Sequence, residues 1–277
     1  MQFHVAGSQF VGTLCLLAAV SIISATGCRQ TPITNRRQLL NPLVPESREI
    51  SMGVSAYNEL LKEEPASGNQ QYIEMVRRVG RRIAAVAGRP DYEWEFRVVR
   101  SPQQNAFCLP GGKVAIYEGI MPICQNEAGL AVVMAHEIAH ATARHGGERM
   151  AHSAVADGVK QAIGYVMQDQ ADRSREIVQT VYGVGSKYAA ILPFSRKHES
   201  EADHIGLIYM AKAGYDPREA PLFWERFGQA SQGNPPEFLS THPSHGRRSS
   251  DLQELLPEAL GHYESATPKY GKGASIR

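Results

Sequence analysis

The sequence lacks a strong charge of either sign, and beyond its first 27 residues it lacks long hydrophobic runs. Its 277 residues hold 29 Lys and Arg against 28 Asp and Glu. A general nucleic-acid-binding protein needs a basic excess to release counterions, so this balance argues against that class. A mean hydropathy of −0.30 excludes a polytopic membrane protein. With 43% hydrophobic residues the chain is typical of a globular protein, and its length allows one large domain or two small ones.

Asp, Glu, Lys and Arg are absent from residues 1–27, which contain His4, and residues 10–27 are apolar or small. An apolar core of about 7–15 residues is typical of a signal peptide, whereas a spanning helix needs about 20. Residues 25–28 (Ala-Thr-Gly-Cys) are similar to a bacterial lipobox, although Ala25 stands where Leu is usual and no Lys or Arg precedes it. We therefore expect a lipoprotein-type signal peptide and lipidation of Cys28. An uncleaved N-terminal anchor is the alternative.

Either alternative places residues 28–277 outside the cytoplasm, at a membrane surface. Arg29 follows the cysteine, and a residue other than Asp here resembles the signal for sorting to the outer membrane. Only two cysteines come later, Cys108 and Cys124. An even pair in an oxidising compartment can form a disulfide, but free buried cysteines are common, so the sequence leaves this open.

The remaining pattern predicts an α+β chain that is mostly helical, with a small β-sheet. Apolar residues recur at spacings typical of a helix over 70–87, and they alternate as in a strand over 94–99. We also expect an extended lead-in over 28–48, short strands over 106–109 and 113–117, helices over 47–62, 127–145, 195–213, 218–231 and 247–260, one or two more within 150–192, and a flexible tail over 265–277.

A His-Glu-x-x-His motif, His136-Glu137-Ile138-Ala139-His140, falls on the helix expected from residue 127. Four residues turn a helix by about 400°, so the two histidines share a face one turn apart. Neutral imidazoles at this spacing can bind one Zn²⁺, and Glu137 can accept a proton from the metal-bound water. Two ordinary buried histidines are the alternative.

A catalytic zinc site needs a third protein ligand. A metzincin is excluded because Ala143 and Gly146 replace its glycine and histidine. His145 lies about 180° around the helix from His136 and cannot join the pair. The remaining source is a carboxylate on the helix expected from residue 195.

Glu199 and Asp203 share a face of that helix, whereas Glu201 points away from Glu199. This arrangement suits a site in which Glu199 binds zinc and Asp203 accepts a hydrogen bond from a ligand imidazole. A solvent-exposed acidic face is the alternative.

The order of several motifs resembles the HtpX/OMA-type metallopeptidase family, which includes the CaaX prenyl proteases. They are residues 105–113 (Asn-Ala-Phe-Cys-Leu-Pro-Gly-Gly-Lys), the His-Glu-x-x-His helix, Ser195-Arg196 with Glu199, Ala202 and Asp203, and Thr241-His242-Pro243 with Arg247. The resemblance extends over about residues 28–255 and is strongest to periplasmic lipoprotein members. It implies a single gluzincin-like metallopeptidase domain, over residues 49–264, with the sheet beside the active-site helix.

The resemblance also implies roles for individual residues. His136, His140 and Glu199 would hold one Zn²⁺ per chain, Glu137 would be the general base, and Asp203 would support the site. His242, or alternatively the nearby His245, would lie near the metal, either closing the open position or stabilising the oxyanion. The strand near residues 112–117 would pair with extended substrate, which makes Asn105, Gly112 and Val114 the expected substrate-binding residues.

Together these features predict a zinc endopeptidase of the bacterial cell envelope, anchored to the outer membrane by Cys28. Its partners would be misfolded or unassembled polypeptides and the membrane, with no nucleic acid. A latent, membrane-tethered chaperone with a histidine-capped site, and a zinc hydrolase of non-peptide amides, are the alternatives.

Overall fold

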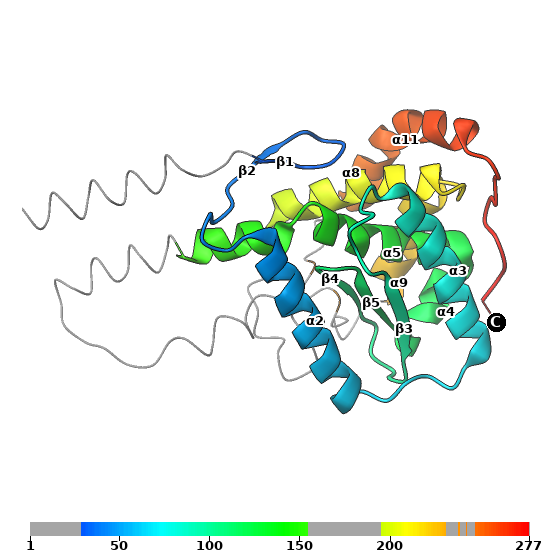
Figure 1. Ribbon diagram of the computed structural model, residues 1–277. Helices are drawn as coiled ribbons and strands as arrows, with labels where there is room; N and C mark the ends of the chain where they lie inside the picture. The colour runs from blue at the N-terminus through cyan, green and yellow to red at the C-terminus, as the bar shows by residue number, and fades with distance from the viewer. Residues whose placement is uncertain (1–28, 155–194, 231–237, 239–241, 243–246, 277) are drawn as a thin grey trace, which may run out of the picture.

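The computed structural model describes residues 29–154, 195–230, 238, 242 and 247–276 (Figure 1). The expected signal peptide, Cys28, His245, and most of the region expected to be helical over 150–192 lie outside these residues. Among the helices described, none combines the length and the apolar character that crossing a membrane requires.

The described residues confirm a mostly helical α+β fold. The helices are α2 (Glu46–Glu63), α3 (Gln70–Val86), α4 (Met121–Cys124), α5 (Glu127–Thr142), α8 (Arg196–Lys212), α9 (Glu219–Ala230) and α11 (Arg248–Ser265), with a 3₁₀ turn η1 (Glu118–Ile120). The strands are β1 (Arg29–Gln30), β2 (Arg37–Gln38), β3 (Glu95–Val99), β4 (Ala106–Leu109) and β5 (Lys113–Tyr117).

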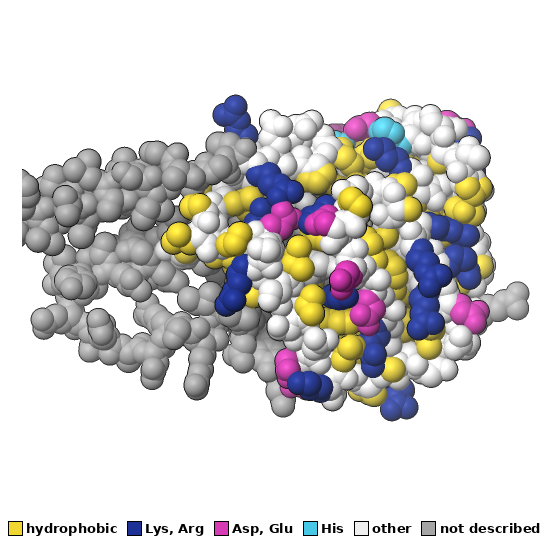
Figure 2. Space-filling model, viewed as in Figure 1, with side chains coloured by type: hydrophobic (Ala, Val, Ile, Leu, Met, Phe, Trp, Pro, Cys, Tyr) yellow, Lys and Arg dark blue, Asp and Glu magenta, His cyan; other side chains and the backbone are white. Residues whose placement is uncertain are grey.

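The main sheet has the strand order β3-β5-β4, with β3 parallel and β4 antiparallel to β5. Gly111 and Gly112 connect β4 to β5 at φ values of +89° and +84°, a region that favours glycine. Helices α2 and α3 flank this sheet (Figure 1). On α3, Val79 and Ile83 are buried, while the arginines form a band on the outer surface (Figure 2).

The position of β5 corrects the expectation that residues 112–117 pair with substrate. Val114 lies opposite Phe96 of β3 and Cys108 of β4, so β5 is bonded on both sides. A central strand has no free backbone edge, and Val114 is fully buried. Strand addition at this sheet therefore requires an edge strand.

Helix α5 forms the centre of the core, and every one of its residues is buried. It contacts α3, α8, α9 and β4. Gly206 brings α8 close to α5: a Cβ atom at this position would lie 3.0 Å from the backbone N of His136. This close crossing brings the acidic face of α8 to the histidines of α5.

The end of α5 differs from the expected helix over 127–145. The helix ends at Thr142, and Arg144 adopts a φ of 53°. Residues 145–154 are helical again. This left-handed turn reorients the chain before His145, so helical periodicity counted from His136 does not give the direction of the His145 side chain.

Both ends of the described chain are tied to the body. Residues 29–38, expected to be extended, contain the antiparallel pair β1–β2. Residues 266–276, expected to form a flexible tail, form backbone hydrogen bonds to Gly214, Asp216 and Glu127. Cys108 and Cys124 are free, so the described chain contains no bridge between them.

Candidate metal centre

Helix α5 positions two histidines one turn apart. Asn126 begins the helix, its side chain accepting a hydrogen bond from the backbone N–H of Gly129. The Nε2 atoms of His136 and His140 lie 3.1 Å apart, and both rings are buried. The two imidazoles therefore direct nitrogens at a common point.

Helix α8 brings Glu199 to the same point. The side chain of Ser195 caps the helix by accepting a hydrogen bond from the backbone N–H of His198. Glu199 follows in the first turn, with one carboxylate oxygen 3.4 Å from His136 Nε2 and the other 3.4 Å from His140 Nε2. The carboxylate thus faces both histidines.

His242 completes the cluster. Its Nδ1 lies 3.1 Å from Glu199 Oε1, and its Nε2 lies 3.5 Å from Glu137 Oε1. One ligand atom from each of His136, His140, Glu199 and His242 lies within 4.8 Å of the others, the one such group found among the described residues. The structure therefore brings together the expected ligands, the expected base and the expected capping histidine.

The donor set fits a divalent metal ion. Glu199 Oε2 and Glu137 Oε1 are buried and form no hydrogen bond within the described residues, although Arg248 Nη1 lies 3.3 Å from the first oxygen and His242 Nε2 lies 3.5 Å from the second. Burying such oxygens is costly unless a cation or donor approaches them. Two imidazoles, a carboxylate and a further imidazole form a nitrogen- and oxygen-rich set that suits Zn²⁺ among the common metals.

The electrostatics of the cluster separate the roles of its carboxylates. Burial raises the pKa of Glu137 above its ordinary value, although His242 and His136 oppose this. Burial also opposes ionisation of Glu199, but His242, His136 and His140 outweigh it and hold its pKa well below the ordinary value. Glu199 is therefore a stable anion suited to a cation, whereas Glu137 is the better proton acceptor and donor.

Asp203 lies one turn after Glu199 and contacts His136 from behind. Its Oδ1 lies 3.0 Å from His136 Nδ1. Arg248 of α11 forms a fork with both carboxylate oxygens, at 2.7 Å each, and its guanidinium lies 3.5 Å from the ring centroid of Trp224. Asp203 thus contacts His136, the geometry that its predicted supporting role requires.

Arg248 is missing from the sequence-based site. The resembled motif includes the preceding Arg247, which is exposed, whereas Arg248 is buried. Two consecutive arginines at the start of a helix point about 100° apart, so at most one of them could face the core. The Arg247-Arg248 pair was therefore the sequence signal for a buried arginine near the site.

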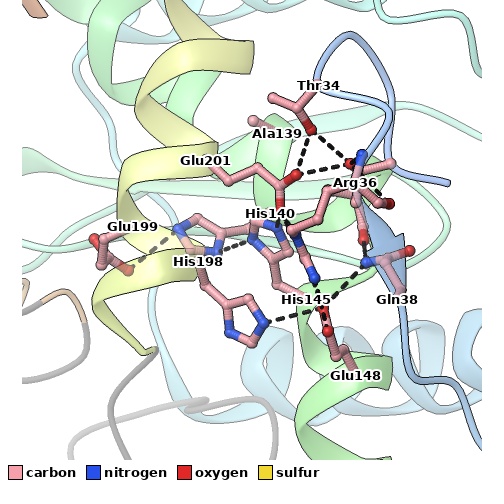
Figure 3. A network of polar contacts seen from close by, with 12 residues as sticks. Thr34, Arg36, Gln38, Ala139, His140, His145, Glu148, His198, Glu199 and Glu201 are labelled. Atoms are coloured by element: carbon pink, nitrogen blue, oxygen red, sulfur yellow. Dashed lines mark hydrogen bonds and ion pairs between the residues drawn. The ribbon is translucent and has the colours of Figure 1, made fainter.

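A second polar group, also missed, lies behind His140 (Figure 3). His145 Nδ1 is 3.0 Å from His140 Nδ1, and Glu201, Glu148 and Arg36 continue the chain of contacts. His145 remains outside the metal cluster, as expected, but it contacts a member of it. The signal was a further histidine five residues after His140.

The expected substrate residues are only partly near the site. Val114 lies within the central strand β5, and Gly112 is the turn residue that precedes this strand. Asn105 is buried, and its side chain accepts a hydrogen bond from the backbone N–H of Ala106. Cys108 of β4 lies near Glu137. Burial raises the pKa of the Cys108 thiol, and the negative charge of Glu137 raises it further. The edge strand β4 therefore borders the cluster.

Comparison with known proteins agrees with this geometry. Residues 70–256 match the model of peptidase family M48. The chain is 39% identical over 249 residues to the mitochondrial metalloendopeptidase OMA1 of Schizosaccharomyces pombe, covering 88% of this chain and 71% of that protein. It is 33% identical over 220 residues to OMA1 of Arabidopsis thaliana, covering 77% of this chain and 43% of that protein.

A bacterial relative is the beta-barrel assembly-enhancing protease of Escherichia coli, 28% identical over 211 residues, which cover 74% of this chain and 43% of that protein. Apart from the fission-yeast protein, these relatives are matched over less than half of their own length. The family match covers more than half of the present chain and includes all four clustered residues. The chain therefore belongs to peptidase family M48, as a metalloendopeptidase related to OMA1 and to the beta-barrel assembly-enhancing protease.

Proposed function

We propose that this chain is a zinc-dependent endopeptidase of the bacterial cell envelope that cleaves misfolded or unassembled envelope proteins. The observation that carries the proposal is the placement of Glu137 beside the His136, His140 and Glu199 cluster. Zn²⁺ held by these three residues would polarise the scissile carbonyl and lower the pKa of a bound water.

Side chains of the protein would transfer the protons and orient the metal-binding histidine. Glu137 Oε1 is buried, has a raised pKa and has no hydrogen-bond partner among the described residues, so it can accept a proton and return it to the leaving amine. Asp203 fixes the ring of His136, and Arg248 fixes Asp203. The cluster is thereby oriented before substrate arrives.

The outer edge of β4 is our proposed substrate-pairing surface, in place of β5. The Asn105 carbonyl accepts a hydrogen bond from the Tyr117 N–H, so the alternate residues Ala106 and Cys108 direct their backbone groups away from β5. The Ala106 N–H donates to the Asn105 side chain, so pairing at Ala106 would use its carbonyl. Backbone pairing along this edge would place an extended chain beside Glu137 with little dependence on its side chains. Broad sequence tolerance suits unfolded substrates.

The proposed location rests on the sequence of residues 1–28 and on the bacterial relative, whose name connects it with beta-barrel assembly. The OMA1 relatives are named as mitochondrial. A Cys28→Ser variant expressed in a bacterium should lose incorporation of labelled palmitate and leave the membrane fraction. Labelled palmitate on the variant at the wild-type level would exclude lipidation of Cys28.

The function is tested with bound-metal analysis and casein digestion, comparing the wild type with Glu137→Gln. We expect one zinc per chain in both proteins. Cleavage by the glutamine variant should be at least about 100-fold slower, since it cannot accept the proton. His136→Ala should lose both metal and cleavage. Digestion by Glu137→Gln at the wild-type rate would contradict the mechanism.

A latent form of the same centre is the second candidate, and the position of His242 favours it. A catalytic zinc site has three protein ligands and one open position, and His242 lies where it can supply a fourth. In that case the wild type should bind zinc but digest casein slowly, and His242→Ala should digest it faster. Slower digestion by His242→Ala would instead assign the residue to catalysis.

A further inference from the structure

The side of His140 that faces away from the metal cluster contacts another histidine. His140 Nε2 is directed to His136, while its Nδ1 lies 3.0 Å from Nδ1 of His145. His145 has no exposed surface, and its Nε2 lies 3.0 Å from Glu201 Oε2. Three buried groups are therefore connected in series: Glu201, His145 and His140 (Figure 3).

The chemistry of these groups fixes the direction of the hydrogen bonds. An ionised carboxylate only accepts, so His145 Nε2 donates to Glu201. Metal binding requires a free lone pair on His140 Nε2, which places the His140 proton on Nδ1. His140 then donates to His145 Nδ1, and the series Glu201–His145–His140 is satisfied at every nitrogen.

Glu201 is in turn oriented by the segment that follows Cys28. Arg36 Nε donates to Glu201 Oε2 at 2.6 Å, and Thr31 Oγ1 donates to Oε1 at 2.7 Å. Thr34 also contacts that oxygen. These residues belong to the β1–β2 hairpin, residues 29–38, which is separated from Glu201 by more than 160 positions in the chain.

The same hairpin fixes the surroundings of His145. Arg36 binds both oxygens of Glu148, at 2.8 and 2.6 Å, and Glu148 accepts a hydrogen bond from His198 at 3.1 Å. The ring of His198 stacks on His145, with centroids 4.6 Å apart. Arg36 therefore orients two carboxylates, one bonded to His145 and the other to the ring stacked on it.

We propose that the hairpin of residues 29–38 is a positioning element of the metal centre, acting on His140 through Arg36, Glu201 and His145. Its role for His140 parallels that of Asp203 and Arg248 for His136. An arginine fixes a carboxylate in both cases; Asp203 contacts His136 directly, whereas Glu201 acts on His140 through His145. Partners of this kind typically contribute about 10–100-fold to metal affinity. The inference rests on the proposed metal centre but not on proteolysis.

The test compares zinc affinity, measured by competition with a chromophoric chelator, in the full-length protein and four variants. His145→Phe keeps the ring volume but removes both hydrogen bonds, and Arg36→Ala removes the guanidinium. Arg36→Lys keeps the charge but not the fork. Arg37→Ala removes the neighbouring, exposed arginine of the same hairpin and is the matched control.

We expect His145→Phe and Arg36→Ala to bind zinc about 10–100-fold more weakly, Arg36→Lys to lose less, and Arg37→Ala to match the wild type. The rise in Tm on adding zinc should shrink in the first two variants, since weaker binding stabilises the fold less. A purely structural role would instead lower Tm equally with and without zinc.

Zinc affinities of His145→Phe and Arg36→Ala within twofold of a zinc-binding wild type would overturn this inference and leave the proposed function intact. A wild type that binds no zinc would overturn the proposed function itself. If Arg36→Ala does not fold, Thr34→Val removes one hydroxyl that contacts Glu201 and the neighbouring Thr31, and it should still weaken zinc binding relative to Arg37→Ala.

Discussion

Asp203 lies between a metal-ligand candidate and a buried arginine, and its charge depends on both. Arg248 is 3% exposed and contacts Asp203, Glu199 and the face of Trp224. Burying a carboxylate is tolerable only while a cation or donor compensates it. At this scale, one guanidinium lowers the pKa of Asp203, orients its carboxylate, and also contacts Glu199.

Replacing Arg248 by Ala should therefore leave Asp203 buried, with His136 as its remaining charged or hydrogen-bonding partner among those described above. We expect a loss of about 3–5 kcal/mol in the free energy of unfolding, as for other broken buried ion pairs. Arg247→Ala, which removes the adjacent exposed arginine, should change stability by less than about 0.5 kcal/mol. Urea unfolding of the metal-free proteins measures both. Equal losses of free energy of unfolding in the two variants would show that the buried Arg248–Asp203 pair stabilises the fold no more than the exposed Arg247 does.

At the scale of secondary structure, the site depends on how closely α5 and α8 cross. Helical spacing places His136 and His140 on one face of α5, and Glu199 and Asp203 on one face of α8. It does not set the distance between the helices. Gly206 does so, because its missing side chain lets α8 approach the backbone of Ala135 and His136.

Gly206→Ala should separate the two helices, because its Cβ would lie 3.0 Å from the backbone of α5. We expect a loss of about 1–3 kcal/mol from overpacking, together with weaker zinc binding. Gly261→Ala on α11 is the control, since nothing lies within 4 Å of its Cβ. Alanine there should stabilise by about 0.5–1 kcal/mol. Thermal unfolding and zinc titration of both variants check this; wild-type zinc affinity in Gly206→Ala would contradict it.

At the scale of the whole molecule, buried ion pairs join segments that are distant in the chain. Arg36 connects the N-terminal hairpin to Glu148 and Glu201, and Arg144 connects the end of α5 to Glu49 of α2. Despite burial, hydrogen bonds from buried histidines and from Arg36 hold the pKa values of Glu148 and Glu201 below the ordinary value, whereas burial raises the pKa of Glu49 in spite of Arg144. The free energy of unfolding should therefore depend on pH in the acidic range.

Glu148 gives this dependence a definite sign. Burial alone would raise its pKa, but hydrogen bonds from His198 and Arg36 outweigh burial and hold it well below the ordinary 4.5. A carboxylate with a lowered pKa stabilises the fold above the unfolded value, about 4.5, and this contribution is lost as the pH falls below it. We expect the free energy of unfolding of the metal-free protein to decrease from about pH 5 downward.

Glu148→Gln should make this decrease shallower, because the variant has no proton to bind at that position. Glu59→Gln, at an exposed position of α2, is the control and should follow the wild-type curve. Urea unfolding at a series of pH values between about 5 and 3 measures the slopes. Parallel curves for Glu148→Gln and the wild type would contradict the assignment.

The sequence by itself determined the features that depend on spacing along one element. The histidine pair of α5, the shared face of Glu199 and Asp203, and the strands β4 and β5 around their glycine turn follow from local periodicity and from residues that break it. These relations hold because bond geometry fixes them within about one turn, whatever surrounds the helix or strand.

Only the tertiary structure decided the features that depend on packing between elements. It made β5 the central strand and β4 the edge, turned Arg248 inward instead of Arg247, and brought Arg36 to Glu201. It also returned His145 to His140 through the turn at Arg144. Such contacts join residues whose distance is set by how whole elements pack and by where backbone turns occur, and no periodicity along the chain encodes that distance.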